Sequence, residues 1–438
     1  MNDMLTLNLS RLSAFLIYFL PFQKWLANTV VVISPLAKDI TFIAFEFAWV
    51  LIFLAFCLFR SFSKQIWFVY LFLVCAAFVA FINIVSRSGG DPNAALAYLS
   101  GFRRLAIPFV TFLVLYKLMQ RKDGLIHINK AVIGLYWFVL CFQAFDFTAM
   151  QLSGDYRGLI VGLSNVADEI SEYPLDSHIV FFGWQSIRSF GFLLNFHGSG
   201  LLLLLLFLYK LHLKGSATLA EVIVMATGVV AGGSLQSLGY LIILPILLLG
   251  NQKVLRTFFA VVLVPLLAAS VWYFSNNPLP HFGTVYFFEY AGILFSVLFE
   301  MLFSAELISD LLWGFGNLRL LFGGWLVGGF DLELGDIGFF RMMLEAGVLV
   351  FLFWLLQCFK LGHYRPNLIK SGRLRDKLKI NALFALPVIG IVSLAHYPVL
   401  FMPINMTIFM LSLAKIHGIT NGLPPRVLPA PNGNDKGS

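Results

Sequence analysis

Three charged residues stand in or beside an apolar stretch near the end of the chain, where charge is costly. Asp336, Arg341 and Glu345 belong to "LELGDIGFFRMMLEAGVLVFLFWLLQ", residues 332–357. One charge at the centre of a bilayer costs roughly 2.5 kcal/mol even on a lenient insertion scale. Arg341 and Glu345 are four positions apart, so they share one helix face and can form a buried ion pair. Asp336 can cap the helix expected from Ile337, or act as a general base if water reaches it.

Arginines stand near the ends of other apolar stretches. Arg103 and Arg104 fall in "YLSGFRRLAIPFVTFLVLY", and Arg188 opens "RSFGFLLNFHGSG". The guanidinium is a planar fork that binds phosphate through two hydrogen bonds and keeps its charge. If these side chains meet in one outward-open cavity, they suit a lipid-linked phosphate or pyrophosphate. The alternative is that each arginine reaches the membrane surface or pairs with a neighbour on its own helix.

Two histidines also lie in apolar surroundings. His197 is in "LLNFHGSG" and His396 is in "SLAHYPVLFMP". A single histidine in a helix bundle is more often a hydrogen-bonded structural residue than a catalytic one. His396 is the better catalytic candidate, because it is expected at the outer rim of its apolar stretch. Glu46, in the middle of another stretch, suits a structural pair or a proton relay.

The composition fixes the class of protein. Of 438 residues, 59% are hydrophobic and 12% are charged, and the mean hydropathy is +0.86. Soluble domains are about half apolar and about a quarter charged, so we expect an all-α polytopic membrane protein. The four cysteines form no CxxC pair and fall in or beside apolar runs, so we expect no disulfide and no metal site. Without a P-loop, GxGxxG or HExxH motif, we expect neither a cofactor nor an ATP-driven pump.

A transmembrane helix needs about 20 apolar residues, and the chain offers twelve candidate spans. The seventh and eighth are short, and the first is read as a retained span rather than a cleaved signal. The twelve predicted spans are 12–34, 40–59, 66–86, 94–117, 131–150, 189–209, 217–233, 236–250, 255–275, 338–359, 380–396 and 399–416.

The distribution of charge predicts the orientation of these spans. With the N-terminus inside, the inner segments hold 21 of the 30 lysines and arginines, so both termini are expected in the cytoplasm. The basic residues are then explained by the membrane surface, without nucleic acid. Residues 1–417 form one predicted transmembrane domain, and the Pro- and Gly-rich residues 418–438 a disordered cytoplasmic tail.

Two long outer loops are predicted, and both are acidic. Residues 151–187 hold five acidic residues against one arginine, and residues 276–337 hold seven against Arg319 alone. The larger loop is expected to carry short helices. An apolar segment within it, residues 283–312, is predicted as an interfacial or re-entrant helix that can cover the outer cavity, rather than as a thirteenth span.

Three stretches of this sequence resemble one known family. They are "RSFGFLLNFHGSG", which begins at Arg188, the Ser-containing helix junction "GGSLQSLGYLIILPILLLG", and "GFGNLRLL" followed by "LGDIGFFRMMLEAGVLVFLF". With the layout of spans and loops, they are similar to the Wzy-type O-antigen polymerase and O-antigen ligase superfamily of bacterial inner membranes. The resemblance covers roughly residues 40–416.

The resemblance implies a metal-independent glycosyltransferase that faces the periplasm. Its donor would be a glycan on undecaprenyl pyrophosphate. Its acceptor would be a lipid-linked repeat unit in a polymerase, or lipid A–core in a ligase. Ligases carry a His-Asn pair at the end of the large loop, where this chain has Asp336 and no histidine, which favours a polymerase. Where the family often has a second arginine, this chain has Gln236; Arg341, Arg319 or the Arg103–Arg104 pair can substitute.

The resulting hypothesis gives each residue a role. Asp336 or His396 is the general base that takes the proton of the acceptor hydroxyl, with inversion at the sugar. A chain-length regulator is a possible partner. The rival outside this enzyme class is a flippase for the same lipid-linked oligosaccharide, but such transporters often show internal repeats, and none is evident here. The substrate-binding set, which holds the pyrophosphate and its surroundings, is Arg188, Arg341, Arg103, Arg104, Arg319 and Glu345.

Overall fold

The structure is a computed structural model of the whole chain. It describes residues 3–23, 25–26, 44–45, 47–55, 92–121, 123–153, 178–181, 184–187, 191–193, 195–231, 235–249, 299, 303, 312, 326–327, 330–331, 342–343, 345–362, 374–395 and 399–420.

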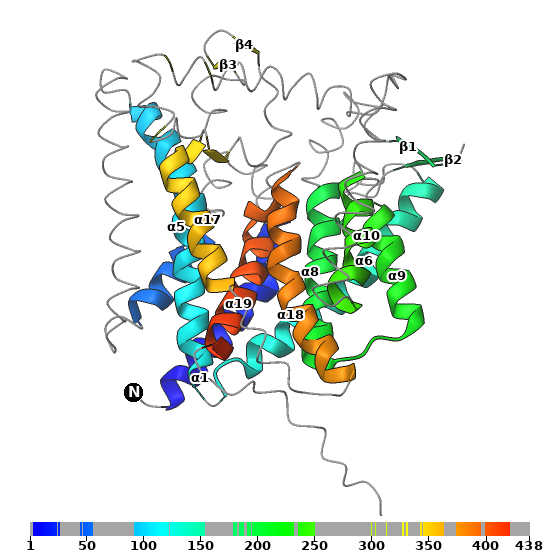
Figure 1. Ribbon diagram of the computed structural model, residues 1–438, viewed down its shortest axis with the longest axis horizontal. Coiled ribbons are helices and arrows are strands. Elements are labelled where there is room, and N and C mark those ends of the chain that lie inside the picture. The colour runs from blue at the N-terminus through cyan, green and yellow to red at the C-terminus, as the bar shows by residue number, and fades with distance from the viewer. Residues whose placement is uncertain are drawn as a thin grey trace, which may run out of the picture.

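The described part of the chain is mainly helical, and its helices stand side by side in a bundle (Figure 1). They are α1 (Asp3–Phe19), α5 (Pro92–Met119), α6 (Ile126–Ser153), α8 (Phe196–Lys214), α9 (Leu219–Ala231), α10 (Leu235–Leu249), α17 (Val348–Gly362), α18 (Leu374–Val392) and α19 (Pro403–Thr420). Short 3-10 turns are η1 (Leu20–Phe22), η6 (Ser393–Ala395) and η7 (Val399–Phe401).

Two small antiparallel hairpins lie beyond one end of the bundle, at the top of Figure 1. Strand β1 (His178–Phe181) pairs with β2 (Trp184–Ile187), and β3 (Leu326–Val327) pairs with β4 (Phe330–Asp331). Two residues separate the strands of each pair, Phe-Gly in the first and Gly-Gly in the second, which is the commonest length of a hairpin loop. Both hairpins fall within the predicted outer loops, where the sequence had predicted short helices in the larger loop and no strands in either.

Helix α8 is the centre of the bundle. Residues 201–208 are all leucine or phenylalanine, and none exposes more than 2% of its surface. A helix that is apolar on every side must be enclosed on every side. It packs against α6, α9, α18 and α19, and these neighbours supply the enclosure.

Hydrogen bonds between segments distant in sequence define the two ends of the bundle. At one end, the Ser10 hydroxyl donates to the carbonyl of Gly124 at 2.6 Å, and the Tyr209 hydroxyl donates to Asn129 Oδ1 at 2.6 Å. At the other end, the Trp25 indole donates to the carbonyl of Phe192 at 2.6 Å. Helices α1 and α6 therefore run in the same direction and α8 runs in the opposite direction, as expected for the first, fifth and sixth predicted spans.

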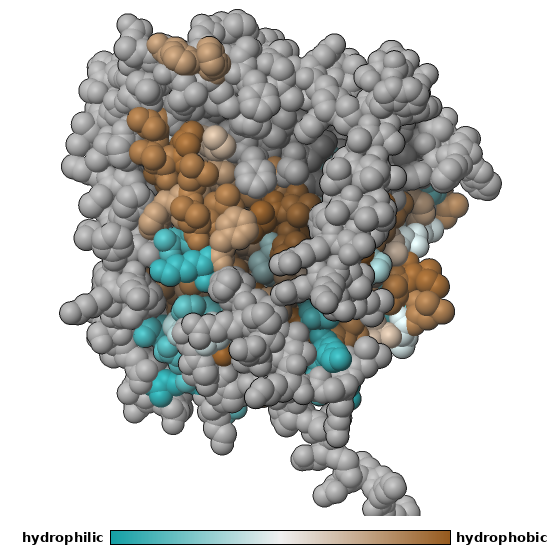
Figure 2. Space-filling view, in the orientation of Figure 1, coloured by the Kyte–Doolittle hydropathy of each residue, from teal (hydrophilic) through white to brown (hydrophobic). Residues whose placement is uncertain are grey.

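The basic side chains that the structure describes gather at one of these ends, which we call the basic end. They lie in the middle of α1, near the start of α6 and α18 and toward the end of α5, α8, α17 and α19. Figure 2 shows hydrophilic residues low on the face in view and hydrophobic residues above them. The opposite end, from which the β1–β2 hairpin leads, we call the hairpin end. The basic side chains are Arg11, Lys117, Arg121, Lys130, Lys210, Lys214, Lys360, Arg375, Lys377, Lys379 and Lys415.

The predicted helical class is confirmed, but twelve spans are not. Within the described residues, one helix, Ile126–Leu152 of 27 residues, is long and apolar enough to cross a membrane. The short predicted spans at 217–233 and 236–250 correspond to α9 and α10 within two residues at each boundary. The predicted spans 66–86 and 255–275 lie outside the described residues.

Two predicted spans are wrong in part. The span 189–209 was placed too early, because Gly191 has a φ of 61° in a turn and Asn195 caps a helix that then runs to Lys214. The span 338–359 is not one continuous helix, because Gly347 has a φ of 86° just before α17 begins. In both places a glycine takes the left-handed conformation that ends or redirects a helix.

Two glycines within helices give a test of the packing. Alanine is more favourable than glycine inside a helix by about 0.8–1.0 kcal/mol. A Cβ at Gly390 in α18 would lie 2.6 Å from Phe409 Cδ2 on α19, whereas a Cβ at Gly239 in α10 would meet nothing within 4 Å. We expect Gly390→Ala to lower the melting temperature of the purified protein in detergent, and Gly239→Ala to leave it unchanged or raise it. Equal behaviour of the two variants would contradict the close approach of α18 to α19.

Candidate functional site

The turn before α8 is held by two buried side chains at the hairpin end. The Gly191 N–H donates to Asp146 Oδ2 at 2.9 Å, and the Leu193 N–H donates to Ser199 Oγ at 3.1 Å. Asp146 and Ser199 each expose 1% of their surface. A Cβ at Gly191 would overlap Ser199 and the Gln143 side chain, so this turn requires a glycine both for its backbone and for its surroundings.

A second contact joins the start of α19 to the same turn of α8. Asn405 Nδ2 donates to the carbonyl of Val399 at 2.9 Å and to the carbonyl of Gly198 at 3.3 Å. Asn405 is completely buried. A Cβ at Gly198 would overlap the sulfur of Met402, so η7 and α19 approach the first turn of α8 very closely.

We call Asp146, Gly191, Ser199, Val399 and Asn405 the hairpin-end cluster. It connects α6, the turn before α8, α8 itself and the η7–α19 junction. All of its hydrogen bonds involve buried polar groups, which gives them well-defined geometry because an unmatched partner there is costly. The cluster therefore joins these four segments of the chain at the hairpin end of the bundle.

Two predicted site residues lie close to members of this cluster in the sequence. Arg188 comes three positions before Gly191, and His396 three positions before Val399. Both lie outside the described residues. Among the described residues, the structure brings together residues 191–193 and the η7–α19 junction, which are far apart in the sequence.

Of the other predicted site residues, the structure describes the side chain of Glu345. Glu345 is described and has no exposed surface. It precedes Trp354, whose ring lies 5.3 Å from that of Phe401 in η7, so Glu345 belongs to the hairpin-end half of the bundle. The structure does not describe the side chains of Arg103 and Arg104, although both residues are in α5. Asp336, Arg341 and Arg319 lie outside the described residues.

The sequence analysis missed Asp146 and Asn405. Asp146 is the only carboxylate within the predicted span 131–150, and Asn405 lies within the span 399–416. A polar residue inside an apolar stretch is the signal that singled out Arg341 and Glu345, and it was present here too. His197, which was considered as a bundle residue, is buried in the first turn of α8.

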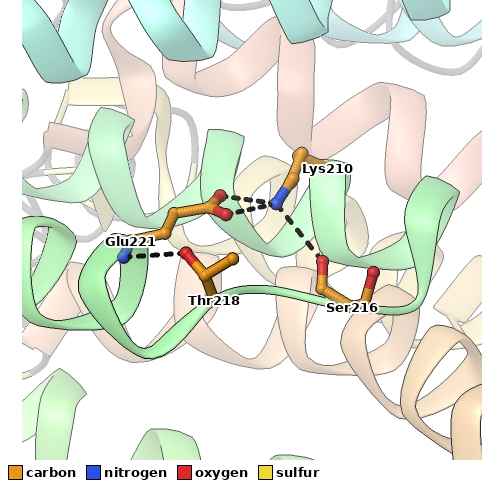
Figure 3. A network of polar contacts seen from close by, with 4 residues as sticks. All are labelled: Lys210, Ser216, Thr218 and Glu221. Carbon is orange, nitrogen blue, oxygen red and sulfur yellow. Dashed lines mark hydrogen bonds and ion pairs between the residues drawn. The ribbon is translucent and has the colours of Figure 1, made fainter.

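The basic end holds a different polar network, shown in Figure 3. Lys210 Nζ, on the last turns of α8, donates to both carboxylate oxygens of Glu221 at 2.5 and 2.7 Å and to the carbonyl of Ser216 at 3.2 Å. Thr218 Oγ1 accepts from the Glu221 N–H at 3.2 Å, the hydrogen bond that caps the start of α9. Lys210 and Glu221 expose only 3% and 8% of their surfaces.

This network is best interpreted as structural. The three ammonium hydrogens of Lys210 have three acceptors, and its charge is balanced by Glu221. The pair fastens the α8–α9 turn, which Gly215 closes with a φ of 69°. Among the described residues, no group of three or more His, Cys, Asp or Glu side chains is placed to hold a metal ion.

Comparisons of the chain with protein-family models, with curated proteins and with solved structures found no match. The functional interpretation therefore depends on the residues and geometry of this chain and on the resemblance of its motifs.

The Lys210–Glu221 pair predicts an asymmetric response to mutation. Removing one partner of a buried ion pair lowers the free energy of unfolding by roughly 3–5 kcal/mol, because the other charge stays buried alone. We expect Lys210→Met and Glu221→Gln each to lower the melting temperature in detergent strongly, and the double variant to recover part of the loss. Lys214→Met is the control, since Lys214 is exposed in the same last turn. A double variant as unstable as the sum of the two single variants would contradict a direct pair.

Proposed function

We propose that this protein is a periplasm-facing polymerase of O-antigen or a related exopolysaccharide in the bacterial inner membrane. It transfers a glycan from undecaprenyl pyrophosphate to a hydroxyl of a lipid-linked repeat unit, without a metal ion and with inversion at the sugar. Both termini are in the cytoplasm, and the chain crosses the membrane many times.

The observation that carries the proposal is the hairpin-end cluster. The segment that follows Arg188 and the segment that follows His396 are both bonded to the first turn of α8. Arg188 and His396, the proposed anion-binding residue and a candidate base, each come three positions before a residue of this cluster in the sequence, and the cluster lies at the end of the bundle away from the described basic side chains. A two-substrate transfer needs this kind of fixed juxtaposition.

The distribution of side chains supports the membrane part of the proposal. Lysine and arginine collect on the cytoplasmic side of membrane proteins, which would turn the basic end inward and the hairpin end to the periplasm. Large apolar side chains are exposed between the two ends, among them Trp137 at 42%, Leu352 at 44% and Leu356 at 64%. Such surfaces suit contact with lipid chains.

The proposed reaction breaks one bond, forms another and moves one proton. The bond between the anomeric carbon of the donor and the pyrophosphate oxygen breaks, and a glycosidic bond forms to the acceptor oxygen. Arg188 and Arg341, helped by Arg103 or Arg104, stabilise the negative charge on the departing undecaprenyl pyrophosphate. Asp336 or His396 takes the proton of the acceptor hydroxyl.

The direct test is the lipopolysaccharide banding of cells that lack this gene and of the same cells complemented with it. Core bearing a single repeat unit, with the ladder restored by the wild-type gene, supports a polymerase. Bare core with long polymer still forming on the lipid carrier would instead indicate a ligase. Bare core without periplasmic polymer would indicate a flippase, and an unchanged ladder would remove O-antigen from the proposal.

Arg188→Lys separates a phosphate-binding fork from a simple positive charge. Lysine keeps the charge but loses the two parallel N–H donors. We expect complementation with Arg188→Lys to restore little or no ladder, while membrane fractions contain the protein at the wild-type level. Wild-type banding from this variant would exclude a bidentate phosphate contact by Arg188.

The general base can be assigned by comparing Asp336→Asn with His396→Gln. Asparagine caps a helix as well as aspartate does, whereas loss of a general base slows a reaction by about 100-fold to 10,000-fold. We expect only one of the two variants to lose the ladder at normal protein level. Near-normal ladders from both would contradict the assignment of either residue as the base.

A further inference from the structure

Lys415 is a buried cation at the basic end, toward the end of α19. It exposes 5% of its surface, about as little as Lys210 with 3%. Lys210 is neutralised by Glu221. Among the described residues, by contrast, no carboxylate lies against Lys415 and no oxygen accepts a hydrogen bond from it. A buried charge is unfavourable unless an opposite charge or a set of hydrogen bonds compensates for it.

Within the described part of the chain, Lys415 makes its electrostatic contact with an aromatic ring. Its Nζ lies 4.5 Å from the centre of the Tyr209 ring in α8. Tyr209 is held in place, because its hydroxyl donates to Asn129 Oδ1 at 2.6 Å. The face of an aromatic ring attracts a cation, but the ring carries no net charge. The positive charge of Lys415 is therefore not balanced by this contact.

A second lysine comes close to the same place from α18. His212 Nδ1 in α8 donates to the carbonyl of Lys379 at 3.0 Å, and a Cβ at Gly215 would lie 2.7 Å from Lys379 Cε. The His212 ring lies 6.1 Å from that of Tyr209. The charges of Lys415 and Lys379 both act on the His212 ring. The two lysines are thus gathered around one histidine, where α8, α18 and α19 pack together (Figure 1).

The exposure of these groups increases from the interior to the surface. Lys415 is buried, while His212 and Lys379 are half-buried. Within the described residues, Lys379 also makes no ion pair. The first turns of α18 carry three basic residues against Asp376 alone. The junction of the three helices therefore has an excess of positive charge that begins at the surface and ends at a buried ammonium group.

We propose that Lys415 and Lys379 bind one phosphate group at the junction of α8, α18 and α19. The phosphate supplies the negative charge and the acceptor oxygens that Lys415 lacks among the described residues. Lysine binds phosphate as a compact point charge with three donors. The group belongs either to the headgroup of an anionic phospholipid, which basic pockets between membrane helices bind, or to free phosphate. This site is at the opposite end of α8 from the hairpin-end cluster, so it does not depend on the proposed transfer reaction.

The test measures the melting temperature of the full-length protein in a neutral detergent while a probe is added. The probes are inorganic phosphate and short-chain phosphatidylglycerol, and sodium chloride at the same ionic strength is the blank. A ligand that binds only the folded protein stabilises it increasingly as its concentration rises above Kd. The concentration dependence of the melting temperature therefore gives an apparent Kd for each probe.

Three variants replace a lysine by methionine, which keeps the length of the side chain and removes its charge. Lys377→Met is the matched control, because Lys377 is exposed in the same helix as Lys379. We expect the wild type to bind at least one probe saturably. Lys415→Met should raise the apparent Kd about tenfold or more and Lys379→Met about threefold or more, whereas Lys377→Met should bind as the wild type does.

Saturable stabilisation that requires Lys415 but not Lys377 supports the site. An apparent Kd at least about tenfold lower for phosphatidylglycerol than for inorganic phosphate identifies a lipid headgroup as the ligand, and the absence of this difference identifies free phosphate. No saturable stabilisation by either probe would overturn the proposal. An equal response of Lys415→Met and the wild type would also overturn it, because a general salt effect acts on every variant alike. If Lys415→Met does not fold, the half-buried Lys379 decides: wild-type binding by Lys379→Met would overturn the site.

Discussion

The complete burial of α8 is the constraint on which the rest of the structure depends. Residues 201–208 present apolar side chains in every direction, so other helices must surround this segment. A helix so enclosed has polar groups at both ends, and water cannot reach all of them. The chain must therefore supply partners at each end, and the hairpin-end cluster and the Lys210–Glu221 network lie at these ends.

The two ends of α8 meet this need in different ways. At the basic end, Lys210 is neutralised by Glu221, and the Arg375 side chain donates to the carbonyl of Lys214 at 2.9 Å. The charged groups at this end belong to α8, α9 and α18, and Arg375 lies 161 positions from Lys214. At the hairpin end, Asn195 caps α8 by accepting from the Gly198 N–H at 2.7 Å. There Asp146 of α6 also accepts from the turn before α8, and Asn405 of α19 donates to the first turn of α8. Both ends of α8 are therefore held by residues from helices distant in the sequence.

The sequence predicted helices well where apolar residues are continuous and poorly where glycine and asparagine intervene. Boundaries of α9 and α10 follow directly from hydropathy. The start of α8 does not, because "RSFGFLL" is as apolar as the helix that follows, and the left-handed turn at Gly191 depends on space between Gln143 and Ser199. The hairpins were missed because strands of two or four residues carry almost no periodic signal.

The same limit applied to the candidate site. Sequence reasoning selected arginines, carboxylates and histidines, since their chemistry is evident from their type. It passed over Asn405 and Asp146, whose importance is visible only when segments far apart in sequence meet: Asn405 lies 207 positions from Gly198, and Asp146 lies 45 positions from Gly191. No local pattern contains such pairs, because a long-range contact is set by the packing of whole helices.

Of the three charged residues singled out in residues 332–357, the structure describes Glu345. Glu345 is fully buried two residues before Gly347, whose φ of 86° interrupts the helix ahead of α17. A continuous span would carry Glu345 on an uninterrupted helix, with no exposed backbone groups beside it. A break instead frees backbone N–H and C=O groups at that depth, and irregular backbone within a membrane is tolerated only where protein or water surrounds it. A buried carboxylate next to a broken helix therefore favours a polar interior at the hairpin end over a lipid-facing helix, and it places that interior on the same side of the bundle as the cluster around Asn405.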